Sequence, residues 1–121
     1  METTFKIESF LNFGRVLALS NGKIDLKVTL DIGPRIIYCA LPGMENVMFE
    51  DIERNVKRDV NMDARMKAFG EDACWYIYGG HRVWFSPEEC PHCYYPDNEP
   101  IEWRQEGDWF IFTPPVQKLT Q

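Results

Sequence analysis

The sequence lacks any long run of apolar residues. Its longest uncharged stretches, residues 36–44, 73–81 and 109–117, fall far short of the ~20 apolar residues that a membrane-spanning helix needs. It also lacks an excess of basic residues, because 13 lysines and arginines stand against 19 aspartates and glutamates and leave a net charge of −6. Nucleic-acid backbones and anionic lipid surfaces repel such a chain on average. We therefore expect no membrane span, no membrane partner and no nucleic-acid partner.

The opening residues METTFKIESF lack the basic segment and the following apolar segment that mark a secretory signal peptide. Cysteine is also scarce, with four residues at positions 39, 74, 90 and 93. Without an export signal, these cysteines favour reduced thiols in a cytoplasm over a disulfide framework. With 121 residues, 45% apolar and 26% charged, the chain has the composition of one globular domain. We predict a cytoplasmic protein with a single domain over residues 1–121.

Residues 23–32 show the clearest local pattern. The even positions from Ile24 to Ile32 are apolar, and the odd positions from Lys23 to Asp31 are polar. This period of two predicts a strand with one buried face. Asn21-Gly22 supplies the positive φ angles of a two-residue type I′ turn, so residues 15–32 are predicted to form a hairpin.

Three further segments have strand-like composition: residues 35–41, 73–85 and 101–113. The first lies between the turn pairs Gly33-Pro34 and Pro42-Gly43, and Glu106-Gly107-Asp108 predicts a hairpin turn within the last. Antiparallel pairing is the architecture that these pieces share, so the predicted fold class is all-β, as an antiparallel β-sandwich.

Two stretches do not read as strands. Residues 51–71 are rich in charge and have apolar residues at helical spacing, which is compatible with a short helix or with a long excursion over the sheet. Residues 86–100 contain prolines that each remove a backbone donor, which predicts an irregular loop.

The segment Cys90-Pro91-His92-Cys93 is a C-x-x-C motif. Its middle residues match those of periplasmic disulfide oxidoreductases, in which the first cysteine begins a long helix. Pro96 and Pro100 follow within seven residues of Cys93, so they disfavour such a helix and the redox interpretation.

Zinc binding is an alternative use of this motif. Cys90 and Cys93 have ligand spacing, and Cys74, His81 or His92 could complete a tetrahedron. Because a single C-x-x-C is half of the usual signature, we favour a structural interpretation, in which Cys39 and Cys74 are small buried hydrophobes and the motif is a surface turn.

A group of polar and aromatic residues gathers in two nearby segments, GGHRVWFSPE and DNEP. Its members are His81, Arg82, Trp84, Glu88, Asp97, Asn98 and Glu99. Such a set suits a sugar, whose hydroxyl groups want bidentate polar partners and whose apolar ring face stacks on an aromatic side chain. His81 and Glu88 would be the catalytic pair, because a histidine and a carboxylate of separated pKa can share two proton transfers.

A purely structural interpretation competes with this one. The tryptophans at positions 75, 84, 103 and 109 lie in strand-like stretches, where aromatic side chains more often belong to the core. Arg82 could simply pair with Glu88. His81 is harder to explain this way, because the two preceding glycines let a ligand or another backbone approach closely.

Four segments together resemble the N-terminal half of galactose mutarotase-like proteins: LKVTLDIGPRII (26–37), PGMENVMFED (42–51), GGHRVWFSPE (79–88) and YYPDNEPI (94–101). The similarity covers about residues 16–117 and is greatest to a bacterial branch related to aldose 1-epimerases. It implies a β-supersandwich with sugar bound on the concave face of a large antiparallel sheet, of which residues 1–121 would form the N-terminal part.

The resemblance also implies a chemistry. In aldose 1-epimerases a histidine protonates the ring oxygen, a glutamate takes the proton of the anomeric hydroxyl, and no metal or organic cofactor is needed. That glutamate belongs to the C-terminal half, and His81 is not equated with the family's acid. We therefore expect a carbohydrate-binding domain for a monosaccharide or sugar derivative, with catalysis by this chain alone in doubt. Open sheet edges would favour self-association. The alternative is a small zinc-stabilised structural or interaction module that uses Cys90 and Cys93.

Overall fold

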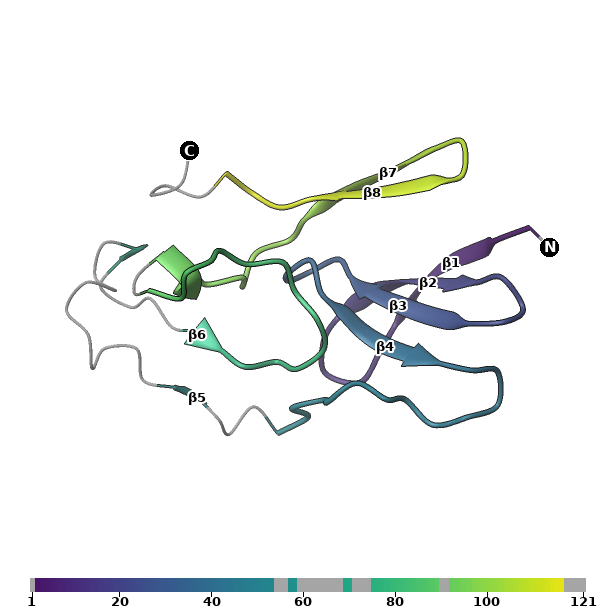
Figure 1. Cartoon of the computed structure of the whole chain (residues 1–121), viewed down its shortest axis with the longest axis horizontal. Helices are drawn as coiled ribbons and strands as arrows, with labels where there is room; N and C mark the ends of the chain where they lie inside the picture. The colour runs from purple at the N-terminus through teal and green to yellow at the C-terminus, as the bar shows by residue number, and fades with distance from the viewer. Residues whose placement is uncertain (1, 54–56, 59–68, 71–74, 90–91, 117–121) are drawn as a thin grey trace.

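The computed structural model describes residues 2–53, 57–58, 69–70, 75–89 and 92–116. These residues form antiparallel strands and very little helix (Figure 1). The elements are β1 (Thr4–Ser9), β2 (Arg15–Ser20), β3 (Asp25–Thr29), β4 (Ile36–Ala40), β5 (Lys57–Arg58), β6 (Trp75–Tyr76), the 3-10 helix η3 (His92–Tyr94), β7 (Glu102–Glu106) and β8 (Trp109–Thr113). The all-β prediction is confirmed. Among the described residues, no helix has the length and apolar character needed to cross a bilayer.

The main sheet is a meander of four strands in the order β1-β2-β3-β4. Strand β2 lies in continuous register with both neighbours, so that Leu17 is opposite Ile7 on one side and opposite Val28 on the other. The register shifts once, where Val28 pairs with Ile36 of β4 rather than with Ile37. The predicted hairpin over residues 15–32 is therefore confirmed.

The turn of this hairpin differs from the prediction. It is centred on Gly22-Lys23, because the amide of Asn21 donates to the carbonyl of Ile24 at 3.3 Å. Only Gly22 has a positive φ, of 80°, so the predicted type I′ turn is wrong. The Asn21 side chain explains why the turn is centred one residue later than predicted. Its Oδ1 accepts hydrogen bonds from the amides of Lys23 and Ile24, both at 2.9 Å, and so stabilises this turn.

Strand β3 is shorter than the alternating pattern suggests. Val28, Leu30 and Ile32 are buried as predicted, but Ile24 is 40% exposed and the strand ends at Thr29. Thr29 is fully buried although its position was predicted to face water. Its hydroxyl donates to the carbonyl of Ile32 at 2.8 Å and accepts the amide of Arg35 at 2.9 Å, so burial costs it no hydrogen bond.

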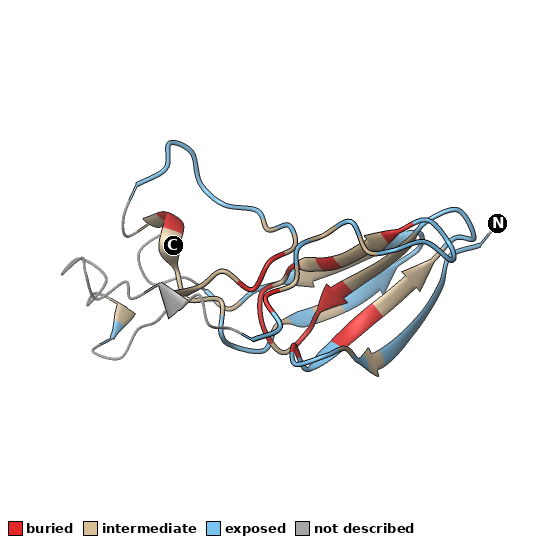
Figure 2. Cartoon of the chain, turned by 90° about the horizontal axis from the view of Figure 1, so that it is seen from below, coloured by how far each residue is buried: buried red, intermediate tan, exposed pale blue. Residues whose placement is uncertain are grey.

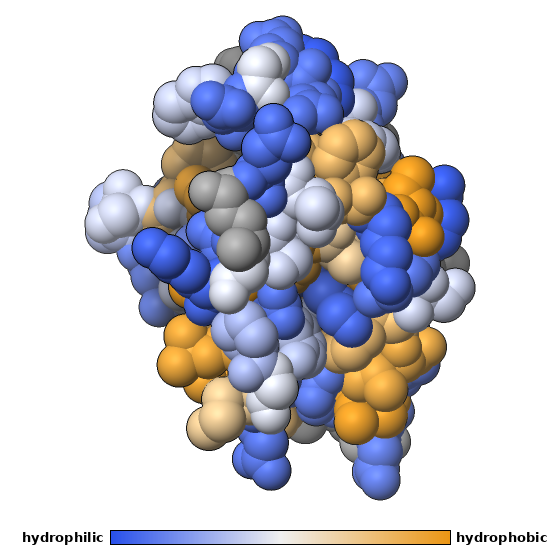
Figure 3. All heavy atoms as spheres, turned by 90° about the vertical axis from the view of Figure 1, so that its right-hand side faces the viewer, coloured by the Kyte–Doolittle hydropathy of each residue, from blue (hydrophilic) through white to orange (hydrophobic). Residues whose placement is uncertain are grey.

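The core lies where the sheet meets the neighbouring loops (Figure 2). Its buried cluster consists of Phe13, Val16, Ile32, Ile37 and Tyr78. Several large apolar side chains elsewhere remain exposed, among them Val47 and Phe49. At the end of the molecule that Figure 3 shows, apolar side chains form separate clusters among hydrophilic ones.

The hairpin β7-β8 confirms the prediction for residues 101–113. It contacts the edge strand of the sheet through Phe5, whose ring centroid is 5.8 Å from that of Trp103 and 5.4 Å from that of Phe110. Both contacts are edge-to-face, which is a favourable arrangement of aromatic rings. These contacts hold the hairpin beside β1 (Figure 1).

Among the described residues, the two edge strands, β1 and β4, differ in whether their outer backbone groups are hydrogen-bonded. Asn46 covers part of the β4 edge: its Oδ1 accepts the amide of Cys39 at 2.9 Å, and its Nδ2 donates to the carbonyl of Ile37 at 3.0 Å. The amide of Val47 adds a hydrogen bond to the carbonyl of Cys39. No described strand pairs with the outer edge of β1. Self-association through an open edge stays a prediction, and β1 is the strand to which it applies.

Residues 73–85 were predicted as a strand, and here the structure differs. Of the described part, only Trp75–Tyr76 is a strand. Tyr78, Gly79 and Gly80 have positive φ angles of 50°, 104° and 67°, which interrupt a regular ladder. The predicted helix or excursion over residues 51–71 lies mostly outside the described residues.

Candidate binding site

The segment after β6 lies against the start of β4 and the loop that follows it. His81 forms an isolated antiparallel bridge with Ile36, and Gly79 forms another with Glu50. Gly79 has to be a glycine, because a Cβ at this position would lie 2.0 Å from the carbonyl oxygen of Phe49. This close backbone approach is the role that the Gly-Gly pair suggested.

Arg35 lies at the centre of the candidate site and is only 4% exposed. Its Nη1 donates to the carbonyls of Ile77 and Gly79, both at 3.1 Å, and its Nη2 donates to Asp97 Oδ2 at 3.2 Å. The irregular backbone around residue 79 leaves carbonyls that no described strand pairs, and the guanidinium donates to two of them. Sequence reasoning missed Arg35. The available signal was a charged residue between a proline and a β-branched run.

Asp97 joins this arginine to a second one. Its Oδ2 lies 3.7 Å from Nη1 of Arg82, and its backbone carbonyl accepts the amide of Gly33 at 3.0 Å. Burial raises the pKa of Asp97 above its ordinary value, while the positive charges of Arg35 and Arg82 oppose that rise. Burial likewise lowers the pKa of both arginines. The three side chains form an Arg-Asp-Arg cluster.

Arg82 lies over two indole rings. Its guanidinium carbon lies 4.5 Å from the ring centroid of Trp84 and 5.3 Å from that of Trp75, and its Nη2 donates to the carbonyl of Cys93 at 2.7 Å. The suggested ion pair of Arg82 with Glu88 is wrong: Asp97 is the paired carboxylate, and Glu88 accepts a hydrogen bond from the hydroxyl of Tyr94.

The tryptophans are more exposed than the core interpretation predicted. Trp84 is 50% exposed and Trp109 is 76% exposed, so that interpretation is wrong for both. Trp75 and Trp103 are partly buried. Half of the Trp84 side chain is exposed beside the guanidinium of Arg82, which lies over its ring, whereas Trp109 lies at the tip of the β7-β8 hairpin.

Two adjoining pockets meet at Arg82. The larger has a volume of about 730 Å³ and is lined by Arg82, Trp84 and Asp97, together with Phe112 and the segment 113–116. The smaller has a volume of about 420 Å³. Three of its lining residues are basic: Arg35, His81 and Arg82. The apolar face of the sheet and the facing hairpin supply its apolar wall, which consists of Leu19, Leu26, Val28, Phe110 and Phe112.

The structure thus brings together some of the predicted site residues and separates others. Arg82, Trp84 and Asp97 share the larger pocket, and His81 joins Arg82 in the smaller one. His81 is exposed. Glu88, Asn98 and Glu99 line neither pocket, and all three are exposed. Asn98 accepts a hydrogen bond from the hydroxyl of Tyr78.

Cys93 is buried instead of lying on a surface turn, so the surface-turn interpretation is wrong at this residue. Its Sγ accepts the amide of Glu89 at 3.3 Å and lies 3.3 Å from the carbonyl oxygen of Phe85. Cys39 is half-buried. Within the described ranges no group of three or more histidine, cysteine or acidic side chains could hold a metal ion. Cys74 and Cys90 lie outside the described residues, so the zinc hypothesis stays a prediction.

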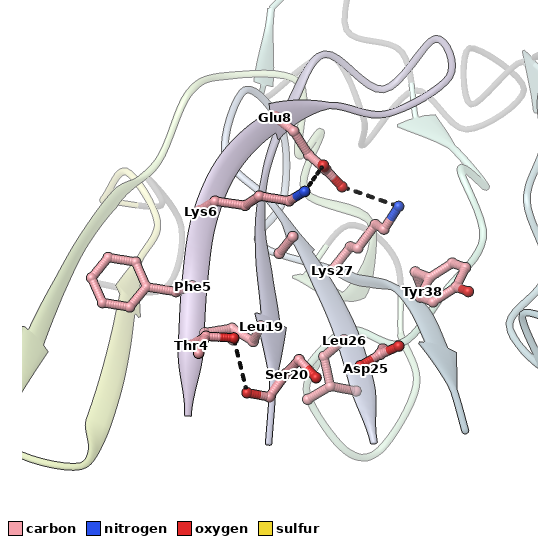
Figure 4. Close-up of a pocket in the computed structure, with 11 residues that line it drawn as sticks. Thr4, Phe5, Lys6, Glu8, Leu19, Ser20, Asp25, Leu26, Lys27 and Tyr38 are labelled. Atoms are coloured by element: carbon pink, nitrogen blue, oxygen red, sulfur yellow. Dashed lines mark hydrogen bonds and ion pairs between the residues drawn. The ribbon is translucent and has the colours of Figure 1, made fainter. Parts of the chain in front are cut away.

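A third pocket, of about 630 Å³, lies on the opposite, polar face of the sheet (Figure 4). Glu8 is its central carboxylate and pairs with Lys27 at 3.1 Å and with Lys6 at 3.3 Å. Hydrogen bonding to Lys27 is the largest cause of the lowered pKa of Glu8. Lys27 Nζ also lies 4.7 Å from the ring centroid of Tyr38. The charged groups of this pocket already neutralise one another, so the pocket offers a ligand less than the Arg-Asp-Arg cluster does.

Comparison with known proteins found no relative of this chain. No protein-family model matches the chain, and neither a curated protein nor a solved structure matches it.

Proposed function

We propose that the chain is a carbohydrate-binding domain of the aldose 1-epimerase type, which holds a monosaccharide or sugar derivative in the larger pocket. One observation carries the proposal: the half-exposed ring of Trp84 and the polar pair Arg82 and Asp97 line the same pocket. Its volume of about 730 Å³ lies within the range of small-molecule sites.

The residue types in this pocket match the two sides of a sugar. The ring of Trp84 offers a flat apolar surface for the C–H face of a pyranose. Arg82 donates and Asp97 accepts hydrogen bonds, so that neighbouring hydroxyl groups of the sugar would find partners of both kinds. The hairpin β7-β8 adds Phe112 as an apolar wall.

The arrangement of the family-like segments supports the same proposal. Arg35 comes from the segment 26–37, Arg82 from 79–88 and Asp97 from 94–101, and the three side chains form one cluster. Segments that lie far apart in the sequence therefore meet at the proposed site. We take the four-stranded sheet and the hairpin beside it to be part of a galactose mutarotase-like sandwich.

The proposal is for binding, with catalysis left to a test. His81 lines the smaller pocket. Glu88 accepts a hydrogen bond from the hydroxyl of Tyr94 and lines neither pocket. Among the described residues these two do not form an acid and base pair across one cavity. His81 and Glu88 thus stay candidates for proton transfer in an isomerase, without geometric support as a pair.

Saturation-transfer NMR with a panel of free hexoses and hexose derivatives tests the proposal. We expect transfer to the ring protons of at least one sugar, its loss in Trp84→Ala, and its retention in Trp109→Ala, which removes an even more exposed indole. Absence of transfer to every sugar would refute carbohydrate binding. Anomer exchange can be followed in the same samples, and an acceleration that His81→Ala abolishes would show isomerase activity.

A further inference from the structure

We infer that the ligand of this site carries an oxyanion, a carboxylate or a phosphate monoester, and that Arg82 and Arg35 hold it. The inference rests on the proposed function for the sugar part of the ligand. The inference therefore assigns acidic sugars as the substrate class. Stacking on Trp84 and hydrogen bonds of hydroxyl groups to Arg82 and Asp97 would, by themselves, also accept neutral hexoses.

The charges of the site are the first support. Arg35 and Arg82 share the single carboxylate of Asp97, so the cluster keeps one net positive charge. Asp97 is the only acidic residue among the described residues that line the two pockets, and no described acidic residue lines the smaller one. This positive site occurs in a chain whose net charge is −6. An anionic group on the ligand would neutralise the excess charge.

Unused hydrogen-bond donors are the second support. Of the five N–H donors that an arginine carries, Arg82 uses only Nη2 in a hydrogen bond to the described residues. Nε of Arg35 is buried and has no partner among the described residues. Buried donors are nearly always satisfied, so each unsatisfied one requires an explanation. Both arginines line the smaller pocket, where a ligand oxygen can accept from the unused donors of Arg82, whereas Nε of Arg35 is buried away from it.

The walls of the smaller pocket strengthen this attraction. Apart from Arg35, His81 and Arg82, the described side chains that line this pocket are apolar. An apolar surrounding lowers the local dielectric, which makes an ion pair between ligand and arginine stronger than the same pair in water. The planar fork of a guanidinium also matches the oxygens of a carboxylate or a phosphate.

The two pockets together suggest how the ligand lies. Arg82 lines both pockets and is stacked on the same indole that we propose as the platform for the sugar ring. A sugar over Trp84 can therefore direct an acidic substituent past Arg82 towards Arg35. His81, which lines the smaller pocket, adds a further donor there.

Isothermal titration calorimetry on the full chain with glucose, glucuronate and glucose 6-phosphate tests this inference, because the three share one ring and differ in charge. We expect at least one acid to bind about tenfold or more tightly than glucose, since charge-assisted hydrogen bonds are roughly twice as strong as neutral ones. The two acids distinguish a carboxylate site from a phosphate site. Galactose and galacturonate repeat the comparison on a second ring.

Arg82→Lys is the matching variant, because it keeps the charge and removes the fork. We expect it to lower the affinity for the acid about tenfold and the affinity for the neutral sugar by a clearly smaller factor, because only the acid places a charged group on the fork. Arg104→Lys on the exposed hairpin is the control and should change neither. Circular dichroism and the unfolding midpoint check that both variants are folded.

The outcomes separate the two proposals. Equal affinity for the neutral sugar and both acids would overturn the oxyanion inference and leave carbohydrate binding intact. Binding of acetate or inorganic phosphate without binding of any sugar would support the oxyanion site and overturn the proposed function. A loss of acid binding and of neutral binding by the same factor in Arg82→Lys would also overturn the inference.

Discussion

The four-stranded sheet and the loop segment, residues 77–89 and 92–99, lie side by side but are held by different interactions. In the sheet, backbone groups pair along β1 to β4, and side chains such as Leu17 are completely buried. In the loop segment, Arg35 supplies hydrogen bonds that a neighbouring strand would otherwise supply. The sheet is stabilised by regular backbone hydrogen bonds and apolar packing, whereas the loop segment is stabilised by a few contacts of charged side chains.

The difference has a consequence for function. A regular sheet uses up its polar backbone groups, so its apolar face offers mainly packing surface. The loop segment needs buried charged donors to satisfy its carbonyls, and those donors then line the adjoining pockets. The groups that stabilise the loop segment are thus the same groups that we propose to bind the ligand.

The largest expected effect comes from removing the charged side chain of Arg35, which donates to the loop segment. Arg35→Met removes a donor from the carbonyls of Ile77 and Gly79 and from the partly buried Asp97, and we expect it to lower the free energy of unfolding by about 3–5 kcal/mol. Urea denaturation measures the loss. Arg104→Met, which breaks an exposed pair with Glu106, should cost no more than about 1 kcal/mol. Equal losses in both variants would contradict the account of the loop segment.

The sheet should respond to the loss of an apolar side chain instead. Leu17 is fully buried between β1 and β3, so Leu17→Ala is expected to cost about 3 kcal/mol through lost burial and a cavity. Leu41→Ala removes the same atoms at a position that is 61% exposed and should cost less than about 0.5 kcal/mol. Thermal unfolding of the two variants compares them, and similar midpoints would argue against a core at this position.

A smaller effect is expected at the close approach of the two regions. Gly79→Ala places a Cβ against the carbonyl of Phe49 at a φ of 104°, and we expect a loss of about 1–3 kcal/mol. Gly107 in the hairpin turn also has a positive φ, of 58°, but a Cβ there meets nothing within 4 Å. Gly107→Ala should therefore cost only about 1 kcal/mol in the same denaturation experiment. A larger loss at Gly107 than at Gly79 would refute the close approach.

The smallest effect concerns an ion pair at the start of β2. The carboxylate of Asp31 accepts two hydrogen bonds from Arg15, one from its backbone amide and one from its Nη2, both at 2.8 Å. Hydrogen bonding to the Arg15 side chain lowers the pKa of Asp31 below its ordinary value of 3.8. A lowered pKa means that the unfolded chain takes up the proton first. The stabilisation is therefore full above the ordinary value and is lost as the pH falls through the lowered one.

This ion pair is partly exposed, so its contribution should not exceed about 1 kcal/mol. The measurement is the difference in unfolding free energy between the native chain and Asp31→Asn, from about pH 7 to about pH 2. We expect the difference to shrink towards the acidic end. A difference that grows towards acid would show that the direction of the pKa shift is wrong.

The parts of the fold that the sequence predicts are those set by local pattern. The hairpin over residues 101–113 follows from its turn residues and its apolar strands, because a hairpin pairs neighbouring parts of the chain. Strand β1 was not predicted. Its apolar members on one face are Phe5 and Ile7, which are too few to establish a period, and its place depends on pairing with β2.

The site was predictable in part for the same reason. Arg82, Trp84 and Asp97 were found because polar and aromatic residue types gather in two short segments. Arg35 was missed because its partners at positions 77, 79 and 97 lie 42, 44 and 62 residues away. Nothing in the sequence around residue 35 shows which carbonyls the folded chain leaves unpaired.

The most direct test of the account is a map of the ligand site by amide chemical shifts in ¹H–¹⁵N NMR spectra. Titration with the acidic sugar that binds most tightly should shift the amides of Gly80, Arg82 and Trp84 and leave those of Lys6 and Lys27, on the polar face of the sheet, in place. Shifts centred on Lys6 and Lys27 instead would move the site to the pocket of Figure 4 and contradict the account.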